Sequence, residues 1–332
     1  MEKVLVTGGT GFIGSHTVVE LIQAGYDVEI LDNLDNSKIS VLDQISKITG
    51  VRPVFHQVDL LDFPKLSKVF SKGGYDSVIH FAGLKAVAES VEKPLKYYEN
   101  NVSGTINLLK CMLNNEVSRL VFSSSATVYG ANSSDSCSEK TPTGVGITNP
   151  YGKTKYMIEE ILKDVCAANP DFSVTLLRYF NPIGAHPSGL IGEDPNGIPN
   201  NLMPIIMKVS RGEIPELSVY GNDYPTFDGT CIRDYIHVVD LAKGHLLALK
   251  KLRPGASVYN LGTGQGTSVL EMVEAFSRAS GRRLPFRIVE RRPGDLPVIC
   301  ADASKANAEL GFKAELTIDD AMHDTLRYIA AY

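Results

Sequence analysis

The residues with the clearest chemistry are a tyrosine and a lysine four positions apart. Tyr151 and Lys155 follow Asn149 and Pro150 in the chain. Asn is a favoured N-cap residue and Pro suits the first helical position, so a helix is predicted to begin here with both side chains on one face. The ammonium could then lower the pKa of the phenol and make Tyr151 a general base. Because the same spacing is common on solvated helix faces, the pair needs independent support.

The size of the required pKa change points to a second cation. Free tyrosine has a pKa of about 10, so a base that works near neutrality needs a decrease of roughly 3 units, or about 4 kcal/mol. One neighbouring cation typically supplies about 1–3 units. An oxidised nicotinamide ring carries a further positive charge and would help to close the gap.

A glycine-rich loop near the N-terminus predicts such a nucleotide site. The segment 8–14 (GGTGFIG) follows an apolar strand, 4–7, and opens a helix that is expected to end near Gly25. Its glycines allow a tight turn and close approach of a pyrophosphate, with the helix N-terminus facing the phosphates. Asp32 closes the next strand, where its carboxylate would bind ribose hydroxyls and repel a 2′-phosphate. No arginine occurs in 33–37, so NAD is favoured over NADP.

The order of the elements predicts an α/β fold built on a doubly wound parallel sheet of the Rossmann type. Short apolar runs alternate with helical segments, and these runs lie at 4–6, 28–31, 54–56, 78–81, 120–122 and 174–177. From about Asn181 the chain is rich in Pro and Gly, which is typical of a substrate-gripping lobe rather than a second sheet core. We therefore expect an NAD-binding domain at 1–180 and a smaller α/β substrate-binding domain at 181–332, with 234–262 packing back on the first domain.

Two strand ends should contribute to the same ligand edge. Asp59-Leu60 and the segment 81–85 (FAGLK) follow the third and fourth strands, where ligands bind in this architecture. We expect contacts there with adenine and nicotinamide, although either segment alone could be an ordinary loop. His80 lies inside an apolar strand and is interpreted as a core histidine rather than a base.

Composition excludes several classes of function. The chain has 332 residues, a hydrophobic fraction of 43% and a net charge of -5, without a run of Lys or Arg. These values argue against a nucleic-acid partner or an anionic membrane surface. The five cysteines are scattered, with no spacing typical of a zinc site, so we expect no metal and reduced thiols. No signal peptide or membrane span is recognisable, and a cytoplasmic location is expected.

Taken together, these motifs resemble the UDP-glucose 4-epimerases of the extended short-chain dehydrogenase/reductase class. The glycine and Tyr/Lys motifs are those of the superfamily, the set from Asn181 to Arg292 is typical of nucleotide-sugar enzymes, and the serine run is typical of epimerases. The resemblance covers nearly the whole chain and rests on 8–14, 81–85, 100, 123–130, 151–155, 179–182, 199–202, 233–237 and 292–295.

The resemblance implies an isomerase that inverts C4 of UDP-glucose and UDP-galactose through a transient 4-keto sugar and tightly bound NAD. Ser125 would hydrogen-bond the sugar 4-hydroxyl, Tyr151 would take its proton as C4 passes a hydride to NAD, and Lys155 would hold the nicotinamide ribose. Alternatively, Ser125 only solvates a strand end. The implied cofactor-binding residues are Gly8, Gly11, Phe12, Ile13, Gly14, Asp32, Asn33, Asn36, Ser37, Asp59, Leu60, Phe81, Ala82, Gly83, Lys85, Asn100, Ser125, Tyr151, Lys155 and Phe180.

The same resemblance implies a UDP-sugar site in the second half of the chain. Arginines match the charge of a diphosphate and Asp295 suits ribose hydroxyls, although surface salt bridging is the common alternative for such residues. The implied substrate-binding residues are Lys85, Ser125, Tyr151, Tyr179, Asn181, Asn201, Leu202, Ser218, Val219, Tyr220, Arg233, Arg292, Asp295 and Ile299.

Position 299 bears on substrate choice in the resembled family. An aromatic residue there goes with enzymes confined to UDP-glucose and UDP-galactose, and a small residue with enzymes that also accept N-acetylated sugars. Ile299 is neither, so weaker activity on UDP-N-acetylhexosamines is expected. Alternatively, Ile299 is a strand residue that packs away from the sugar.

A dehydratase and an NAD-sensing protein are the alternative functions, and neither accounts for the residues at the site. A nucleotide-sugar 4,6-dehydratase needs an acid and a base beside Ser125, where this chain has Ala126 and Thr127. A non-catalytic NAD-sensing protein would not need Ser125, Tyr151 and Lys155 together.

The resemblance suggests a homodimer through the helices after Asn100 and Asn149. Their apolar residues could form its face or only cover the sheet, and they are Leu108, Leu109, Met112, Met157, Ile158 and Ile161.

Overall fold

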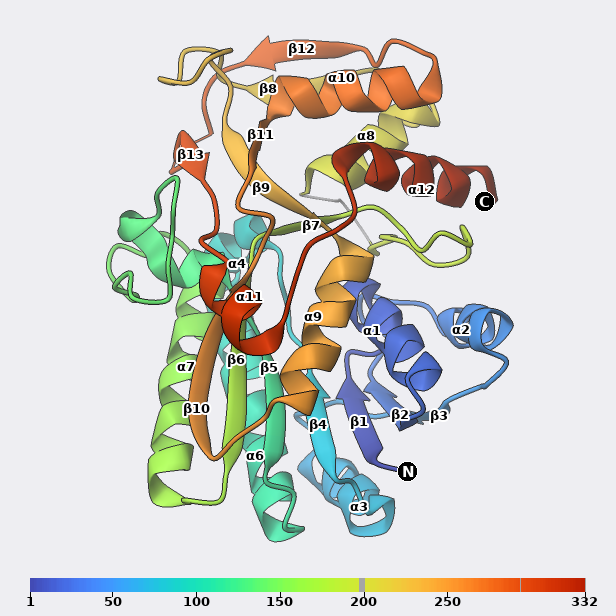
Figure 1. Cartoon of the computed structure of the whole chain (residues 1–332), viewed down its shortest axis with the longest axis vertical. Helices are drawn as coiled ribbons and strands as arrows, with labels where there is room; N and C mark the ends of the chain where they lie inside the picture. Colours follow the sequence, from blue (N-terminus) through green and yellow to red (C-terminus); the bar gives the residue numbers. More distant parts are fainter. Residues whose placement is uncertain (197–200, 293, 332) are drawn as a thin grey trace.

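The computed structural model describes residues 1–196, 201–292 and 294–331. Within these residues seven parallel strands form the main sheet, in the order β10-β6-β5-β4-β1-β2-β3 (Figure 1). The strands are β1 (Lys3–Thr7), β2 (Asp27–Asp32), β3 (Val54–Gln57), β4 (Ser77–His80), β5 (Arg119–Ser125), β6 (Ser173–Tyr179) and β10 (Gly255–Leu261). The predicted α/β fold and its six strands are confirmed.

The seventh strand, β10, was not predicted as a strand. Its sequence GASVYNL mixes small and polar residues with apolar ones, so it lacks the apolar run that marks the other strands. It pairs with β6 over its whole length and forms one edge of the sheet. The neighbouring helix α9 (Val238–Lys250) packs against α1 (Phe12–Gln23). The segment after Asp234 therefore contributes a helix and a strand to the first domain.

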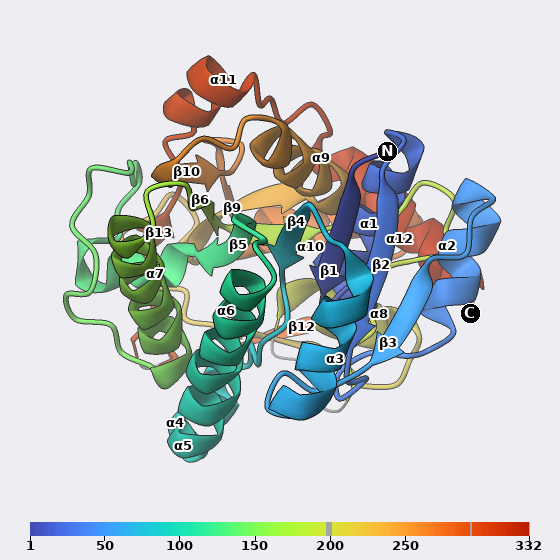
Figure 2. The ribbon, with the colours of Figure 1, turned by 90° about the horizontal axis from the view of Figure 1, so that it is seen from below.

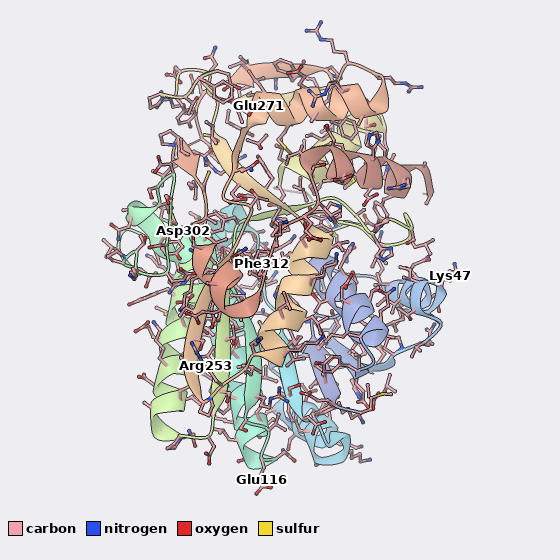
Figure 3. All side chains as sticks on the ribbon, viewed as in Figure 1. Lys47, Glu116, Arg253, Glu271, Asp302 and Phe312 are labelled. Atoms are coloured by element: carbon pink, nitrogen blue, oxygen red, sulfur yellow. The ribbon has the colours of Figure 1, made fainter. Side chains whose placement is uncertain are left out.

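Helices cover both faces of the sheet, and each face has its own apolar core (Figure 2). One core joins α1, α9 and α2 (Val41–Thr49), and the other joins α3 (Phe63–Gly73), α6 (Gly104–Asn114) and α7 (Pro150–Ala168). Figure 3 shows Lys47 and Glu116 extending into solvent, whereas Phe312 is buried beside α9. The order of the strands in the main sheet reverses at β1, which pairs with β2 on one side and β4 on the other. In such sheets a crevice forms at the carboxyl ends of the strands where the order reverses.

The second half of the chain has an apolar core and small sheets of its own, which agrees with the predicted smaller α/β domain. The expectation from its Pro- and Gly-rich texture, that it lacks a second sheet core, is wrong. Its strands are β7 (Asn181–Ile183), β8 (Leu217–Tyr220), β9 (Ile232–His237), β11 (Gly266–Ser268), β12 (Phe286–Val289) and β13 (Val298–Ile299). They form two small sheets, one around β9 and one from β8 and β12. Because these strands have only two to six residues between glycines and prolines, they lack the periodicity that reveals longer strands.

The remaining helices complete this lobe and the rim of the first domain. Side chains of α8, α10 and α12, including Ile206, Phe276 and Met322, pack into the third core. The helical segments are α4 (Val87–Glu92), α5 (Pro94–Tyr97), the π-helix η1 (Tyr98–Ser103), the 3₁₀ segment η2 (Ala126–Asn132), α8 (Leu202–Ser210), α10 (Val269–Ser280), α11 (Ser304–Leu310) and α12 (Ile318–Ala331).

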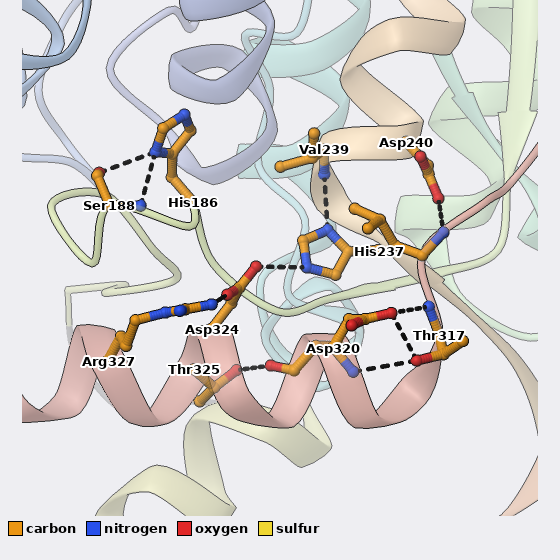
Figure 4. A network of polar contacts seen from close by, with 12 residues as sticks. His186, Ser188, His237, Val239, Asp240, Thr317, Asp320, Asp324, Thr325 and Arg327 are labelled. Atoms are coloured by element: carbon orange, nitrogen blue, oxygen red, sulfur yellow. Dashed lines mark hydrogen bonds and ion pairs between the residues drawn. The ribbon is translucent and has the colours of Figure 1, made fainter.

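A buried polar network ties α12 to the start of α9 (Figure 4). Nδ1 of His237 accepts a hydrogen bond from the Val239 N–H at 3.1 Å, and its Nε2 lies 3.3 Å from Asp324 Oδ2. Asp240 Oδ2 accepts from the backbone N–H groups of residues 315 and 316 at 2.8 and 2.7 Å. The C-terminal helix is therefore fixed to an element of the first domain.

The residues proposed for a helix-pair face mostly cover the sheet of this chain. Leu108, Leu109, Met112 and Ile158 are buried in the core beneath α6 and α7, and Ile161 packs against that core. Only Met157 of this set is exposed, at 42%. The structure therefore favours the alternative for the five covered residues, and Met157 is the member of the set that is exposed for a contact between copies.

Candidate active site

A cavity of about 600 Å³ lies where the strands of the main sheet end. Its wall includes residues that follow β1, β2, β3, β4, β5 and β6 on one side and residues of the second lobe on the other. The predicted cofactor residues all line it, from Gly8 to Phe180. The predicted substrate residues line it as well, except Val219, which is buried in the third core, and Ile299. A single space therefore brings the two predicted sets together.

The glycine loop is shaped for close approach to a ligand. Gly8 has φ +72°, and a Cβ there would lie 2.7 Å from the Ala82 nitrogen. A Cβ on Gly14 would lie 2.2 Å from the Gly8 oxygen, which also accepts the Gly11 N–H at 3.1 Å. Only glycine lets the loop turn this tightly against the start of α1, so the free N–H groups of that helix end face the cavity. This geometry fits the pyrophosphate of a dinucleotide.

Asp32 organises the loop that would hold the adenosine. Its Oδ1 accepts the Leu34 N–H at 2.9 Å, and its Oδ2 accepts the Thr10 N–H at 3.2 Å. The Ser37 hydroxyl is 3.3 Å from Oδ1 and 2.7 Å from the Thr10 hydroxyl. These bonds join the loop after β2 to the glycine loop. A carboxylate has lone pairs left for ribose hydroxyls, so the residues present fit NAD here.

Local sequence signals start α7 as predicted. Asn149 Oδ1 accepts the Gly152 N–H at 2.8 Å, and Pro150 is the first helical residue. A Cβ on Gly152 would lie 2.8 Å from Ile147 and 3.2 Å from Thr127. The missing side chain therefore lets the start of α7 approach the segment after β5. That approach brings Tyr151 toward the end of β5, where Ser125 lies.

The environment of Tyr151 differs in one respect from the sequence-based expectation. Burial raises the pKa of its phenol, while a hydrogen bond with Ser125 and the charge of Lys85 act in the opposite direction. Lys155 Nζ instead donates to the Ser123 carbonyl at 2.6 Å. The cation that opposes the effect of burial on Tyr151 is thus Lys85, at the end of the loop after β4. The expected effect of Lys155 on the phenol stays a prediction.

Lys155 is buried in the cavity wall beside the ring of Phe122. Burial lowers the pKa of its ammonium to about 7, and the carboxylate of Glu159 opposes this shift. Its Nζ also lies 4.9 Å from the centre of the Phe122 ring. Ser123 and Ser125 line the same cavity as Lys155.

A buried ion pair behind Lys155 was not predicted. Glu159 Oε2 accepts from Arg178 Nη2 at 2.6 Å, and its Oε1 accepts from Arg178 Nε at 2.9 Å and from the Ser124 hydroxyl at 2.5 Å. Both side chains are almost fully buried, at 0% and 3% exposure. Arg178 also donates to the Tyr129 hydroxyl at 3.3 Å. This network locks α7 to β5 and β6, so it fixes Tyr151 and Lys155 relative to Ser125.

Two further polar residues of the site were missed. Asn101 Oδ1 accepts the Leu84 N–H at 2.8 Å, and its amide group donates to Leu84 O at 3.0 Å and to the Thr154 hydroxyl at 3.1 Å. It thereby fixes the loop before Lys85. The buried Glu193 accepts from Lys85 Nζ at 2.9 Å and from the Asn201 amide at 3.0 Å.

His80 is the predicted core histidine. It has hydrogen bonds to two threonines, and burial lowers its pKa to about 3.

Cationic side chains of the second lobe border the other end of the cavity. Arg233 donates to the carbonyls of Ile232 and Leu296 at 2.9 and 2.8 Å, and its Nη2 lies 3.6 Å from Asp295 Oδ1. Arg292 stacks on Tyr220, with its guanidinium carbon 4.4 Å from the ring centre. The two guanidinium groups are held by the protein and face the same space, which suits a diphosphate.

Ile299 lies beside the cavity rather than in its wall. It pairs with Arg233 in register and packs against a cluster that includes Tyr129, Cys137 and Phe180. Phe180 itself lines the cavity. The packing agrees with the alternative in which the side chain points away from the sugar, and its role in substrate choice stays a prediction.

The described residues contain neither a candidate metal site nor a helix that could cross a membrane. Among them, no cluster of three or more His, Cys, Asp or Glu side chains could hold a metal ion. In the same residues, no helix has both the length and the apolar character that a membrane crossing requires. The five cysteines are buried and unpaired.

Comparisons with known proteins agree with this site. Residues 4–262 match the family model described as NAD dependent epimerase/dehydratase family. The chain is 54% identical over 327 residues to the UDP-glucose 4-epimerase of Bacillus subtilis, covering 98% of this chain and 96% of the relative. It is also 55% identical over 326 residues to the UDP-glucose 4-epimerase of Yersinia enterocolitica, covering 98% of this chain and 97% of that one.

Solved structures extend the likeness to the whole fold. The UDP-glucose 4-epimerase of Bifidobacterium longum, in complex with NAD⁺ and UDP, has a TM-score of 0.96 and 53% identity, and the match covers 99% of this chain and 98% of that one. The UDP-Glc/GlcNAc 4-epimerase of Campylobacter jejuni has a TM-score of 0.86 and 34% identity over the full length of both. The chain belongs to the NAD-dependent epimerase/dehydratase family and, within it, to the UDP-glucose 4-epimerases.

Proposed function

We propose that the protein interconverts UDP-glucose and UDP-galactose by inverting C4 of the sugar while NAD stays in the cavity. The observation that carries this proposal is the single cavity that joins the glycine loop, the Ser125–Tyr151 pair and the two arginines. When bound, NAD would supply the acceptor and then the donor of the hydride that leaves C4 and returns to its opposite face. The product then has the oxidation state of the substrate.

The chain's own residues bind the substrate and the cofactor and transfer the protons. Tyr151 takes the proton of the 4-hydroxyl as the carbonyl forms and returns it when the alcohol is restored, with Ser125 hydrogen-bonded to the same oxygen. Arg233 and Arg292 hold the diphosphate while the sugar turns over between the two hydride transfers. Asp32 and the glycine loop hold the dinucleotide. Lys155 binds the nicotinamide ribose from the wall beside Ser125.

The main alternative chemistry lacks its general acid and base at the two positions after Ser125. A 4,6-dehydratase must move protons at C5 and C6 after the same oxidation. The positions after Ser125 are Ala126 and Thr127, and the Thr127 hydroxyl donates to Ser125 Oγ at 3.0 Å. Neither side chain can act as a general acid or base. Activity on UDP-N-acetylhexosamines, weaker than on UDP-glucose, is also part of the proposal. It rests on the resemblance, in which position 299 bears on substrate choice, because Ile299 itself packs beside the cavity and not in its wall.

Incubation of the purified protein with UDP-galactose, without added NAD, tests the proposal. We expect UDP-glucose to form without accumulation of NADH, and mass spectrometry of the denatured protein to find NAD. A 4-keto-6-deoxy product would identify a dehydratase, and NADH formed in proportion to product would identify an ordinary dehydrogenase. No turnover by protein that contains NAD would favour a sensor.

We also infer that the protein is a cytoplasmic homodimer. Apolar side chains on adjoining helices are exposed, with Val91 at 60%, Leu95 at 80% and Met157 at 42%. Helices α4 and α5, which carry the first two, pack beside α7, which carries the third. Such exposure supports an interface between copies, and buried free thiols suit a reducing compartment. Light scattering of the purified protein measures the mass, and Leu95→Glu should lower it to that of one chain.

A further inference from the structure

A segment of the second lobe crosses to the first domain beside the cavity. In Figure 1 this segment, 190–196, belongs to the yellow-green loop below α12 and above α1 and α2. Residues 190–195 contribute to the cavity wall. Behind them, a Cβ on Gly192 would lie 2.7 Å from the ring of Tyr328 in α12, so the segment rests closely on that helix. We call residues 190–196 the strap.

One end of the strap is fastened to the loop after β2. Asp194 forms an ion pair with Lys38. The Asn196 N–H donates to Asn36 Oδ1 at 3.0 Å, and its side-chain amide donates to the Asp35 carbonyl at 3.1 Å. All three partners belong to the loop that Asp32 organises, where the adenosine end of a dinucleotide would lie.

The middle of the strap is fastened near Tyr151. Glu193 accepts from Lys85 Nζ at 2.9 Å and from the Asn201 amide at 3.0 Å. Its side chain is only 4% exposed, although it belongs to a loop. Lys85 ends the loop after β4, where the nicotinamide end would lie, and its charge acts on Tyr151. The strap therefore holds the first domain at two points on either side of the glycine loop.

We propose that the strap is a clasp that slows the release of NAD, with Glu193, Asp194 and Asn196 as its positioning residues. The proposal rests on the function proposed above, since it requires NAD in this cavity. The contacts of Glu193 on one side, and of Asp194 and Asn196 on the other, join the strap to two loops of the first domain that flank the glycine loop. We expect the cofactor to leave only after both sets of contacts detach. An enzyme that returns the hydride within one turnover gains from this retention, because early release would leave the ketone stranded.

The direct test is the rate at which NAD leaves the loaded protein. Protein saturated with NAD is diluted into buffer with activated charcoal, and the NAD that remains bound is measured over time by mass spectrometry. Exposed ion pairs have small effects, so Asp194→Asn should speed release about 1.5–5-fold. Because buried charges depend strongly on their partners, Glu193→Gln combined with Asp194→Asn should speed it at least about 10-fold.

A matched substitution controls for charge removal alone. Asp319 of α12 forms an exposed ion pair with Arg278 of α10, and neither residue belongs to the strap or lines the cavity. Asp319→Asn should therefore leave the release rate unchanged. Salt adds a second readout, since ions screen exposed pairs. Raising the salt concentration should speed release from the wild-type protein and have less effect on Asp194→Asn, whose pair with Lys38 is already lost.

The outcomes separate this proposal from the one on which it rests. If the wild-type protein turns over UDP-galactose and holds NAD, but folded Asp194→Asn and the double variant release NAD at the wild-type rate, the clasp is refuted and the function stands. If the wild-type protein neither holds NAD nor turns over, both are refuted. A double variant that does not fold leaves Asp194→Asn and the salt dependence to decide, because Asp194 is exposed and its replacement leaves the core intact.

Discussion

Replacing Glu159 with Gln should weaken the fold and change the pH dependence at the same time. Glu159 is fully buried on α7, one turn after Lys155, and receives three hydrogen bonds from Arg178 and Ser124. Removing one partner of a buried ion pair leaves the other charge uncompensated, which costs about 3–5 kcal/mol. A thermal melt of the variant should therefore show a clearly lower midpoint.

The pH effect follows from the second role of the carboxylate. Burial lowers the pKa of Lys155 to about 7, and the charge of Glu159 opposes that shift. Glu159→Gln removes the opposing charge, so the pKa of Lys155 falls further. Each unit of that fall shifts the ratio of protonated to neutral lysine about tenfold at a given pH. Because the site uses the ammonium, the basic limb of the kcat profile should move to lower pH.

A control variant separates the two effects. Arg178→Gln also breaks the buried pair but leaves the charge of Glu159 in place. It should lower the melting midpoint to a similar extent without moving the basic limb to lower pH. A folded Glu159→Gln variant with the wild-type midpoint and the wild-type basic limb would refute this account of the network.

Five further substitutions test the site. Tyr151→Phe should keep the fold and the bound NAD but lose about 10²–10⁴-fold in kcat, because it removes only the oxygen that moves the proton; near-normal turnover would exclude the role. Lys85→Met removes the charge that lowers the pKa of Tyr151, so the acid limb of the pH profile of kcat should move to higher pH. If Lys155→Met causes this shift and Lys85→Met does not, the effect belongs to Lys155. Ile299→Tyr should abolish activity on UDP-N-acetylglucosamine, and Ile299→Ser should enhance it. The ratio of the kcat/KM values for UDP-N-acetylglucosamine and UDP-glucose should change by about 10–200-fold. A constant ratio would show that the side chain only packs against its neighbours.

Local signals made much of the site predictable. The start of α7 follows from Asn149 and Pro150, whose effects act within one helical turn. The turn of the glycine loop follows from positions such as Gly8 and Gly14, where any Cβ would collide with backbone. The order of short apolar strands then places these motifs at one edge of the sheet, because the carboxyl ends of parallel strands lie together.

The residues that were missed act through long-range pairing. Glu193 meets Lys85 across 108 positions in sequence, and Arg178 meets Glu159 across 19. Nothing in the type or spacing of such residues distinguishes a buried partner from a solvated charge. Asn101 is a similar case, since its amide bridges a loop and α7 only once the chain has folded. Strand β10 was missed because tertiary pairing with β6, rather than an apolar run, makes it a strand.

The fate of the hydrogen on C4 tests the central claim most directly. UDP-galactose that carries deuterium at C4 is incubated with the protein in ordinary water, and the UDP-glucose product is analysed by NMR and mass spectrometry. If the hydride leaves C4 and returns to the same carbon while Tyr151 moves only the hydroxyl proton, the deuterium stays at C4 of the product. Loss of the deuterium to solvent would contradict the account, because it would mean that C4 exchanges a proton with water.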